Sequence, residues 1–266
     1  MTTANRKGAR RMSEIPPAVL RQLEAGQIAT VNLVEFLAVD QRRLLEVALG
    51  QIGKGALVDT ILAALPRARR ATAVQHVIVI GQELGRHLTP SASPRSAWGN
   101  LARHSSDIVR SWAAFAAVSG DSRAFHDQLA AIRPFAADGH FGVREVAWLA
   151  LRPQIERQLT AAIELLAAWS QEADANLRRF ASEATRPRGV WCAHIQALKE
   201  QPQLGLPILE PLKADASKYV RDSVGNWLND AAKSRPTFVR ALCRRWKKES
   251  PAAETAYIVQ KAMRNL

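Results

Sequence analysis

An internal repeat of helix-forming segments constrains the fold of this chain more than any other feature. Each copy has an apolar–Arg step followed by small or apolar residues three and four positions later. The copies are DIVRSWAAFA from Asp107, FGVREVAWLA from Phe141, NLRRFASEA from Asn176 and YVRDSVGNWL from Tyr219. Their apolar anchors, Val109, Val143, Leu177 and Val220, are 34, 34 and 43 residues apart. Periods of this size are typical of stacked helical hairpins, so the repeat predicts an all-α fold.

A second helical stretch precedes three of these segments and supplies the other half of a hairpin. The stretches are FHDQLAAIRPFA, LTAAIELLAAW and LPILEPLK. One hairpin cannot bury its apolar stripe alone, so we expect a single domain of HEAT-like repeats over residues 14–266. We expect this domain to curve into a solenoid with a basic concave face. The longer last interval places extra residues around TRPRGVWCAHIQALKEQP, where we expect a loop or lengthened hairpin on the binding face.

Prolines punctuate the helical pattern and are expected to separate its segments. They are Pro16, Pro17, Pro66, Pro90, Pro94, Pro134, Pro153, Pro187, Pro202, Pro236 and Pro251.

The chain is strongly basic, with 37 Lys and Arg against 24 Asp and Glu and a net charge of +13. This surplus favours a polyanionic partner, nucleic acid first and an anionic membrane surface second. A soluble protein that is merely basic remains an alternative. Residues 1–13 are basic and polar without an apolar signal core, so we expect a flexible arm.

The cysteine and histidine content indicates no metal site and no cofactor. Cys192 and Cys243 are too few for a disulfide framework and suit a reducing cytoplasm. The histidines form no metal-binding motif, and no apolar run reaches the length of a membrane span. We therefore expect a monomeric cytoplasmic protein that is associated with the nucleoid when it binds DNA.

Two repeat helices are predicted to present carboxylates opposite their core stripes. In the helix over residues 217–233, the core side comprises Val220, Val224, Trp227, Leu228 and Ala231. The opposite side comprises Asp222, Asn226, Asn229 and Lys233, with Asp230 and Tyr219 at its edge. In the helix from Phe141, the stripe comprises Val143, Val146, Ala147 and Ala150, while Glu145, Trp148 and Arg152 stack apart from it. Two alternatives follow for the carboxylates of Glu145, Asp222 and Asp230. They either face one shared groove or are solvated charges on the helix surface.

Arginines in the repeats and one tryptophan in the insertion are the candidate DNA contacts. Guanidinium groups suit phosphate oxygens, although each arginine could equally be a surface residue or an inter-repeat ion pair. These arginines are Arg110, Arg144, Arg178, Arg179, Arg186, Arg188 and Arg221. Trp112 and Trp227 fit core stripes. Trp191 lies in the insertion, where it either packs on a sugar or base or plugs a repeat junction.

Two long segments resemble signatures of the AlkC-type DNA alkylation repair glycosylases. SEATRPRGVW (residues 182–191) resembles SEGTRPR-x-x-W, and KYVRDSVGNWLNDAAKSRP (residues 218–236) resembles YVR-x-SVAN-x-LNDIAK-x-HP. The resemblance implies a HEAT-like glycosylase that removes 3-methyladenine and 3-methylcytosine from duplex DNA without a deep base pocket. It implies catalytic roles for Glu145, Trp191 and Asp230. The DNA-binding residues expected with them are Arg110, Arg144, Arg152, Arg186, Arg188, Arg221, Asn226 and Lys233.

The chain departs from these signatures at four positions. Ala184 and Gly225 replace the usual Gly and Ala, Trp227 replaces a commonly polar residue, and Asp222 stands where a second basic residue is frequent. Asp222 is expected to weaken the local phosphate contact. The alternative function is a non-enzymatic HEAT-repeat module that binds nucleic acid or protein and gives Glu145 and Asp230 no chemical role.

Overall fold

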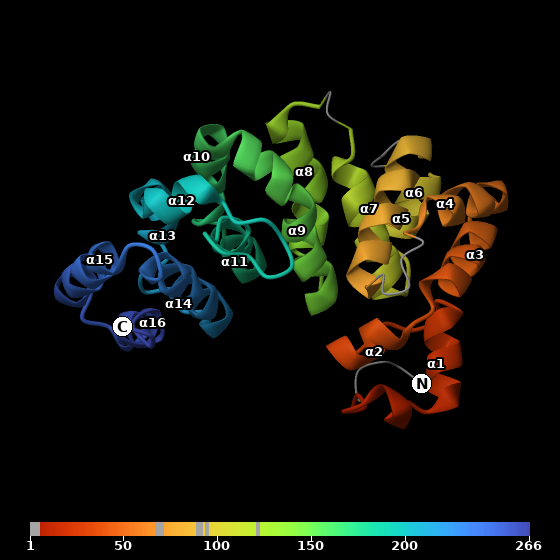
Figure 1. The fold of residues 1–266 in the computed structure, drawn as a ribbon, viewed down its shortest axis with the longest axis horizontal. Helices are drawn as coiled ribbons and strands as arrows, with labels where there is room; N and C mark the ends of the chain where they lie inside the picture. The colour runs from red at the N-terminus through yellow and green to blue at the C-terminus, as the bar shows by residue number, and fades with distance from the viewer. Residues whose placement is uncertain (1–5, 67–71, 89–92, 94–95, 121–122) are drawn as a thin grey trace. The chain divides into compact units, whose positions relative to one another are not determined.

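The regular structure of this chain is helical throughout the described residues. The computed structural model describes residues 6–66, 72–88, 93, 96–120 and 123–266, and every regular element within these ranges is a helix (Figure 1). The all-α prediction is therefore confirmed. No helix in the described ranges is long and apolar enough to cross a membrane.

The internal contacts divide the chain into two compact units. The first comprises residues 1–123 and 139–150, and the second comprises residues 124–138 and 151–266. The long helix α9 (Phe141–Arg157) contributes to both. The single domain expected over residues 14–266 stays a prediction, and each unit is described by itself.

The first unit contains seven α-helices besides the beginning of α9, within the described residues. They are α1 (Pro17–Glu24), α2 (Leu33–Ala38), α3 (Gln41–Gln51), α4 (Val58–Ala64), α5 (Ala73–His87), α6 (Ala97–Ala102) and α7 (Asp107–Val118). Helix α5 packs along α7, and α6 and α4 pack against this pair. Local sequence fixes the start of α5, because Thr72 and Gln75 form a reciprocal capping box.

Part of the segment expected as a free arm contacts the first unit. Arg6 forms an ion pair with the buried Glu35, and its Nη2 lies 2.9 Å from Glu35 Oε2. The Asn32 amide donates to the carbonyl of Ala9 at 2.8 Å. Residues 1–5 of the expected arm lie outside the described residues, and the flexible arm over residues 1–13 stays a prediction.

The second unit contains the remaining helices, arranged as successive hairpins. They are α8 (Phe125–Ala136), α10 (Leu159–Trp169), α11 (Ala175–Ala184), α12 (Gln196–Glu200), α13 (Leu206–Leu209), α14 (Lys218–Ala232), α15 (Pro236–Glu249) and α16 (Ala253–Ala262). Helix α11 packs against α14, and α14 packs against α16. The repeat segments identified in the sequence form α7, α9, α11 and α14, as predicted.

Two details of the predicted segmentation are wrong. Pro134 and Pro153 do not separate helices but lie inside α8 and α9. The partner helix expected over residues 206–213 is also shorter, because α13 ends at Leu209, two residues before Pro211. Pro90 and Pro94 lie outside the described residues.

Helix α14 is covered on more sides than its sequence predicts. The five residues of its expected core stripe are each 0% exposed, which confirms that stripe. Asn229 and Asp230, which were expected at the polar surface, are buried. Asn229 is buried because it faces the neighbouring helix α16, and its side-chain amide donates to the carbonyl of Ala262 in that helix at 3.1 Å. A helix packed against several neighbours buries polar residues that a two-sided wheel assigns to solvent.

Candidate active site

An exposed tryptophan in a left-handed backbone conformation marks the insertion loop between α11 and α12. Trp191 is 62% exposed. Its φ is +61°, and within the described residues no other non-glycine residue has a positive φ. This conformation costs free energy in a large L-residue, and such strain is often found at functional sites. The exposure argues against the alternative in which Trp191 plugs a repeat junction.

A buried arginine holds the main chain of this loop in place. Arg152, near the end of α9, is 2% exposed. Its guanidinium donates to the carbonyls of Ala184 at 2.9 Å, Arg186 at 2.6 Å and Ala193 at 3.1 Å. All three of these nitrogens bind the loop's backbone, and the DNA contact expected for Arg152 stays a prediction. Arg152 shapes the loop that carries Trp191.

Further contacts close the same loop at its base. The indole Nε1 of Trp227 donates to the carbonyl of Thr185 at 2.9 Å. The backbone N–H of Ile195 donates to the carbonyl of Pro187 at 3.1 Å. Carbonyls at both ends of the loop are therefore bound, which restricts the main chain on either side of Trp191. An aromatic ring on such a loop can meet a partner with little loss of conformational entropy.

Asp230 lies in a buried ion pair with an arginine from the insertion loop. Arg186 Nε and Nη2 lie 2.9 Å and 2.7 Å from Asp230 Oδ2. The other oxygen, Oδ1, lies 3.4 Å from Lys233 Nζ. Asp230 is only 4% exposed, so the expectation that it lies on an exposed rim of α14 is wrong. Arg186 covers it, and this guanidinium is engaged by protein carboxylates.

A second carboxylate, Glu183, completes this cluster and was not identified from the sequence. Its Oε1 accepts from Arg186 Nη1 at 2.7 Å, and its Oε2 accepts from the Ser223 hydroxyl at 2.7 Å. Arg179 Nη2 lies 3.7 Å from the same Oε2. Burial would raise the pKa of Glu183, but Arg179, Arg186 and Ser223 together lower it below its ordinary value. The one sequence signal was its place within the signature segment at residues 182–191.

Three other predicted DNA contacts of the second unit have different surroundings. Lys233 has a side chain that is 49% exposed, so it keeps the freedom expected of a phosphate contact. Arg188 donates to the Ser234 hydroxyl at 2.8 Å. Asn226 accepts from Arg264 at 3.1 Å. DNA-binding roles for Arg188, Asn226 and Lys233 stay predictions.

The arginines of the apolar–Arg step share a structural role. In three repeats, the arginine Nη1 donates to two backbone carbonyls six and five residues earlier, in the loop that precedes the helix. Arg110 binds the carbonyls of His104 and Ser105, Arg178 those of Glu172 and Ala173, and Arg221 those of Asp215 and Ala216, at distances of 2.7–3.2 Å. These arginines thus hold their own loops, and phosphate binding by Arg110, Arg144 and Arg221 stays a prediction.

Glu145 belongs to the first unit and is partly exposed. Its Oε2 accepts from Trp148 Nε1 at 2.9 Å. The exposed stack expected for Glu145, Trp148 and Arg152 is wrong, because Trp148 and Arg152 are 4% and 2% exposed. A catalytic role for Glu145 stays a prediction.

Asp222 forms ion pairs with two neighbouring lysines. It lies 2.8 Å from Lys218 Nζ and 2.8 Å from Lys261 Nζ, and it accepts from the Tyr257 hydroxyl at 2.6 Å. Burial would raise the pKa of Asp222, but these three partners hold it well below its ordinary value. Asp222 therefore belongs to the contact between α14 and α16.

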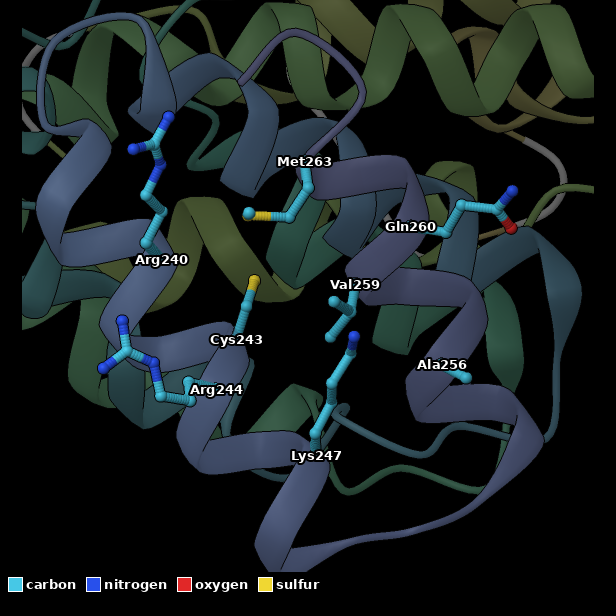
Figure 2. Close-up of a pocket in the computed structure, with 8 residues that line it drawn as sticks. All are labelled: Arg240, Cys243, Arg244, Lys247, Ala256, Val259, Gln260 and Met263. Atoms are coloured by element: carbon cyan, nitrogen blue, oxygen red, sulfur yellow. The ribbon is translucent and has the colours of Figure 1, made fainter.

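A separate cavity of about 520 Å³ lies between α15 and α16 (Figure 2). Its lining comprises Arg240, Cys243, Arg244, Lys247, Ala256, Val259, Gln260 and Met263. None of the predicted site residues contributes to it. The described part of the chain also contains no group of three or more His, Cys, Asp or Glu side chains that could hold a metal ion.

Comparison with known proteins places the fold. No protein-family model matches the chain. The uncharacterized protein YhaZ of Bacillus subtilis is 42% identical over 117 residues, which is 44% of this chain and 32% of YhaZ.

Three solved structures share the fold. The chain matches the alkylpurine DNA glycosylase AlkC of Pseudomonas fluorescens, bound to DNA containing an abasic site analogue, with a TM-score of 0.69 and 25% identity over 97% of this chain. It spans 65% of that AlkC chain. AlkD2 of Streptococcus mutans matches with a TM-score of 0.57, 20% identity and coverage of 82% of this chain and 99% of its own. The protein smu.31 of Streptococcus mutans UA159 matches with a TM-score of 0.53, 22% identity and coverage of 83% of this chain and 98% of its own. The chain therefore has an AlkC/AlkD-like fold, as its signature segments predicted.

Proposed function

We propose that this AlkC-like helical chain is a DNA glycosylase that excises cationic N-alkylated bases, such as 3-methyladenine and 3-methylcytosine, from duplex DNA. The observation that carries the proposal is the insertion loop. It presents the exposed, conformationally strained Trp191 on a fixed main chain and binds Asp230 through Arg186. The fold shared with a DNA-bound alkylpurine glycosylase supports this assignment.

The residue types suit cleavage of a bond to a cationic base. Such a base already carries positive charge and is a good leaving group, so no strong general acid is needed. As the bond to the deoxyribose loosens, positive charge develops on the sugar, and a carboxylate can stabilise it and orient water. We assign this role to Asp230, with Oδ1 as the reacting oxygen because Arg186 binds Oδ2. Lys233 is the side chain that contacts Oδ1, at 3.4 Å, so we expect this exposed lysine to move aside when substrate approaches Oδ1.

Trp191 is assigned the contact with the deoxyribose or base. Its ring is exposed, and an aromatic face packs on nucleotides without requiring a particular sequence. Lys233 and Arg188 supply positive charge in the same unit. The catalytic role expected for Glu145, a residue of the other unit, stays a separate prediction. This arrangement favours recognition of the DNA backbone over a deep pocket for a flipped base.

The test is an assay of abasic sites in methylated duplex DNA incubated with the purified protein. A glycosylase produces abasic sites, and heat or alkali then cleaves the strand. We expect Trp191→Ala and Asp230→Asn each to reduce these sites strongly. A parent protein that binds duplex DNA but leaves it without abasic sites would instead be a non-enzymatic binding module.

A further inference from the structure

Arg186 lies between two buried carboxylates and divides its donors between them. Nε and Nη2 face Oδ2 of Asp230, while Nη1 donates to Oε1 of Glu183. The Arg186 and Glu183 side chains are 13% and 6% exposed. Ser223 holds the other oxygen of Glu183 at 2.7 Å, so Glu183 is itself fixed.

We propose that Glu183 is a positioning residue that orients Arg186 and offsets its charge, so that the Asp230 carboxylate keeps the negative charge needed to stabilise a cationic transition state. The proposal rests on the proposed function, because it assigns Glu183 a part in the same reaction. Glu183 itself is buried and acts through Arg186 rather than by touching the substrate.

The electrostatic part of the argument follows from counting the charges around Asp230. A guanidinium paired with one carboxylate forms a neutral pair, and a neutral pair stabilises a developing cation poorly. The second carboxylate makes the trio of Glu183, Arg186 and Asp230 negative by one unit, and Arg179 beside Glu183 brings these four side chains to neutrality. Without the charge of Glu183, the same group would carry one surplus positive charge next to Asp230. Arg179 and Lys233 lie at the ends of this trio, at 3.7 Å from Glu183 and 3.4 Å from Asp230. The Lys233 side chain is about half-exposed, so solvent screens its charge more than it screens the less exposed charges of Arg179 and Arg186.

The geometric part concerns which oxygen of Asp230 is available. Glu183 binds Nη1 and thereby turns the Nε–Nη2 edge of Arg186 toward Oδ2 of Asp230. Both donors then meet the same oxygen, and Oδ1 is left with the longer contact to Lys233. A freely rotating guanidinium could bind both oxygens and withdraw Oδ1 from a reactant.

Glu183→Gln separates charge from shape, because Gln retains an acceptor for Arg186 and loses the negative charge. We expect kcat for release of 3-methyladenine to fall about tenfold or more, the scale of a unit charge acting in a partly buried site. KM should change less than twofold, because Glu183 does not contact DNA. The matched control is Glu210→Gln, which removes a carboxylate from the Arg245 ion pair elsewhere in the same unit and should leave kcat unchanged.

The outcome that overturns the proposal is a folded Glu183→Gln protein with the kcat of the parent, since Glu183 would then be structural only. A loss that appears in KM alone would overturn it as well. A parent protein without glycosylase activity refutes the proposed function, and a second measurement then decides the positioning role. The Arg186 Nε–H resonance should exchange slowly with solvent in the parent and in Glu183→Gln and rapidly in Glu183→Ala. Equal exchange in parent and Glu183→Ala would show that Glu183 does not position Arg186.

Discussion

Replacing Trp191 by glycine and by alanine separates the ring's role from the strain of its backbone. At φ +61°, a non-glycine residue costs about 1–2 kcal/mol, and glycine avoids this cost. Glycine loses about 0.5–1 kcal/mol more backbone entropy than alanine on folding. The difference predicts that Trp191→Gly is more stable than Trp191→Ala by about 0.5–1 kcal/mol.

The ring itself contributes little to stability. Trp191 is 62% exposed, so removing it sacrifices only about 2 kcal/mol of apolar burial at most. A buried plug would cost about 3–5 kcal/mol instead. In a chain of this size, 1 kcal/mol corresponds to about 2–4 °C in Tm. Differential scanning fluorimetry should therefore place Trp191→Gly about 1–4 °C above Trp191→Ala.

Activity should not follow stability across this pair. Both variants lack the ring, so both should lose excision to the same extent, by about tenfold or more if the ring contributes an ordinary stacking contact. The abasic-site assay measures the loss, and the parent protein is the reference. A glycine variant less stable than the alanine variant would refute the reasoning about φ. Parent-like excision by either variant would refute the role of the ring.

Three further changes test the surroundings of Asp230 and the contact between α14 and α16. Asp230→Asn should lower the free energy of unfolding in urea by about 1–3 kcal/mol, less than leaving a buried charge fully unpaired would, because Arg186 still pairs with Glu183. A decrease below about 0.5 kcal/mol would contradict the buried ion pair. The same variant should lower excision by about 10² while DNA affinity holds or rises. Asp222→Asn tests the lowered pKa of Asp222, whose carboxylate stabilises the fold above its unfolded pKa of about 4 and loses this effect as the pH falls. The difference between the urea unfolding midpoints of parent and variant should therefore shrink between pH 5 and pH 2. A difference that stays constant with pH would refute this. Lys233→Ala should reduce the slope of log affinity against log salt by about one unit if Lys233 binds a phosphate, and an unchanged slope would remove it from the interface.

The sequence predicts the repeat helices well because their apolar spacing is dictated by burial on one side. The repeat segments coincide with α7, α9, α11 and α14 to within one residue at their starts, and the full stripe of α14 is as expected. Prolines were poorer guides, since Pro134 and Pro153 are accommodated within helices. Tertiary packing can override such a local preference.

The candidate site was predictable in its residue types but not in its burial. Periodicity assigns a residue to one of two faces, whereas α14 has neighbours on several sides, so Asp230 was placed on an exposed rim. An arginine's charge likewise indicates an affinity for oxygen but does not distinguish phosphate from a backbone carbonyl. Arg152 illustrates the ambiguity: its charge led to the expectation of a DNA contact, and the structure shows it bound to three backbone carbonyls. Glu183 lacked any periodic or spacing signal beyond its place in the signature segment.

The carbonyl-binding arginines have a consequence for how such chains are recognised and how they diversify. Arg110, Arg178 and Arg221 each bind the loop that leads into their own helix, so these three copies each carry their own means of anchoring that entry. Duplicated copies can therefore diverge in the segments between them, as the longer insertion before α14 illustrates. We therefore expect the apolar–Arg step to mark this architecture in related sequences. Inheritance of the chemistry must be judged from other positions, including Glu183, Trp191 and Asp230.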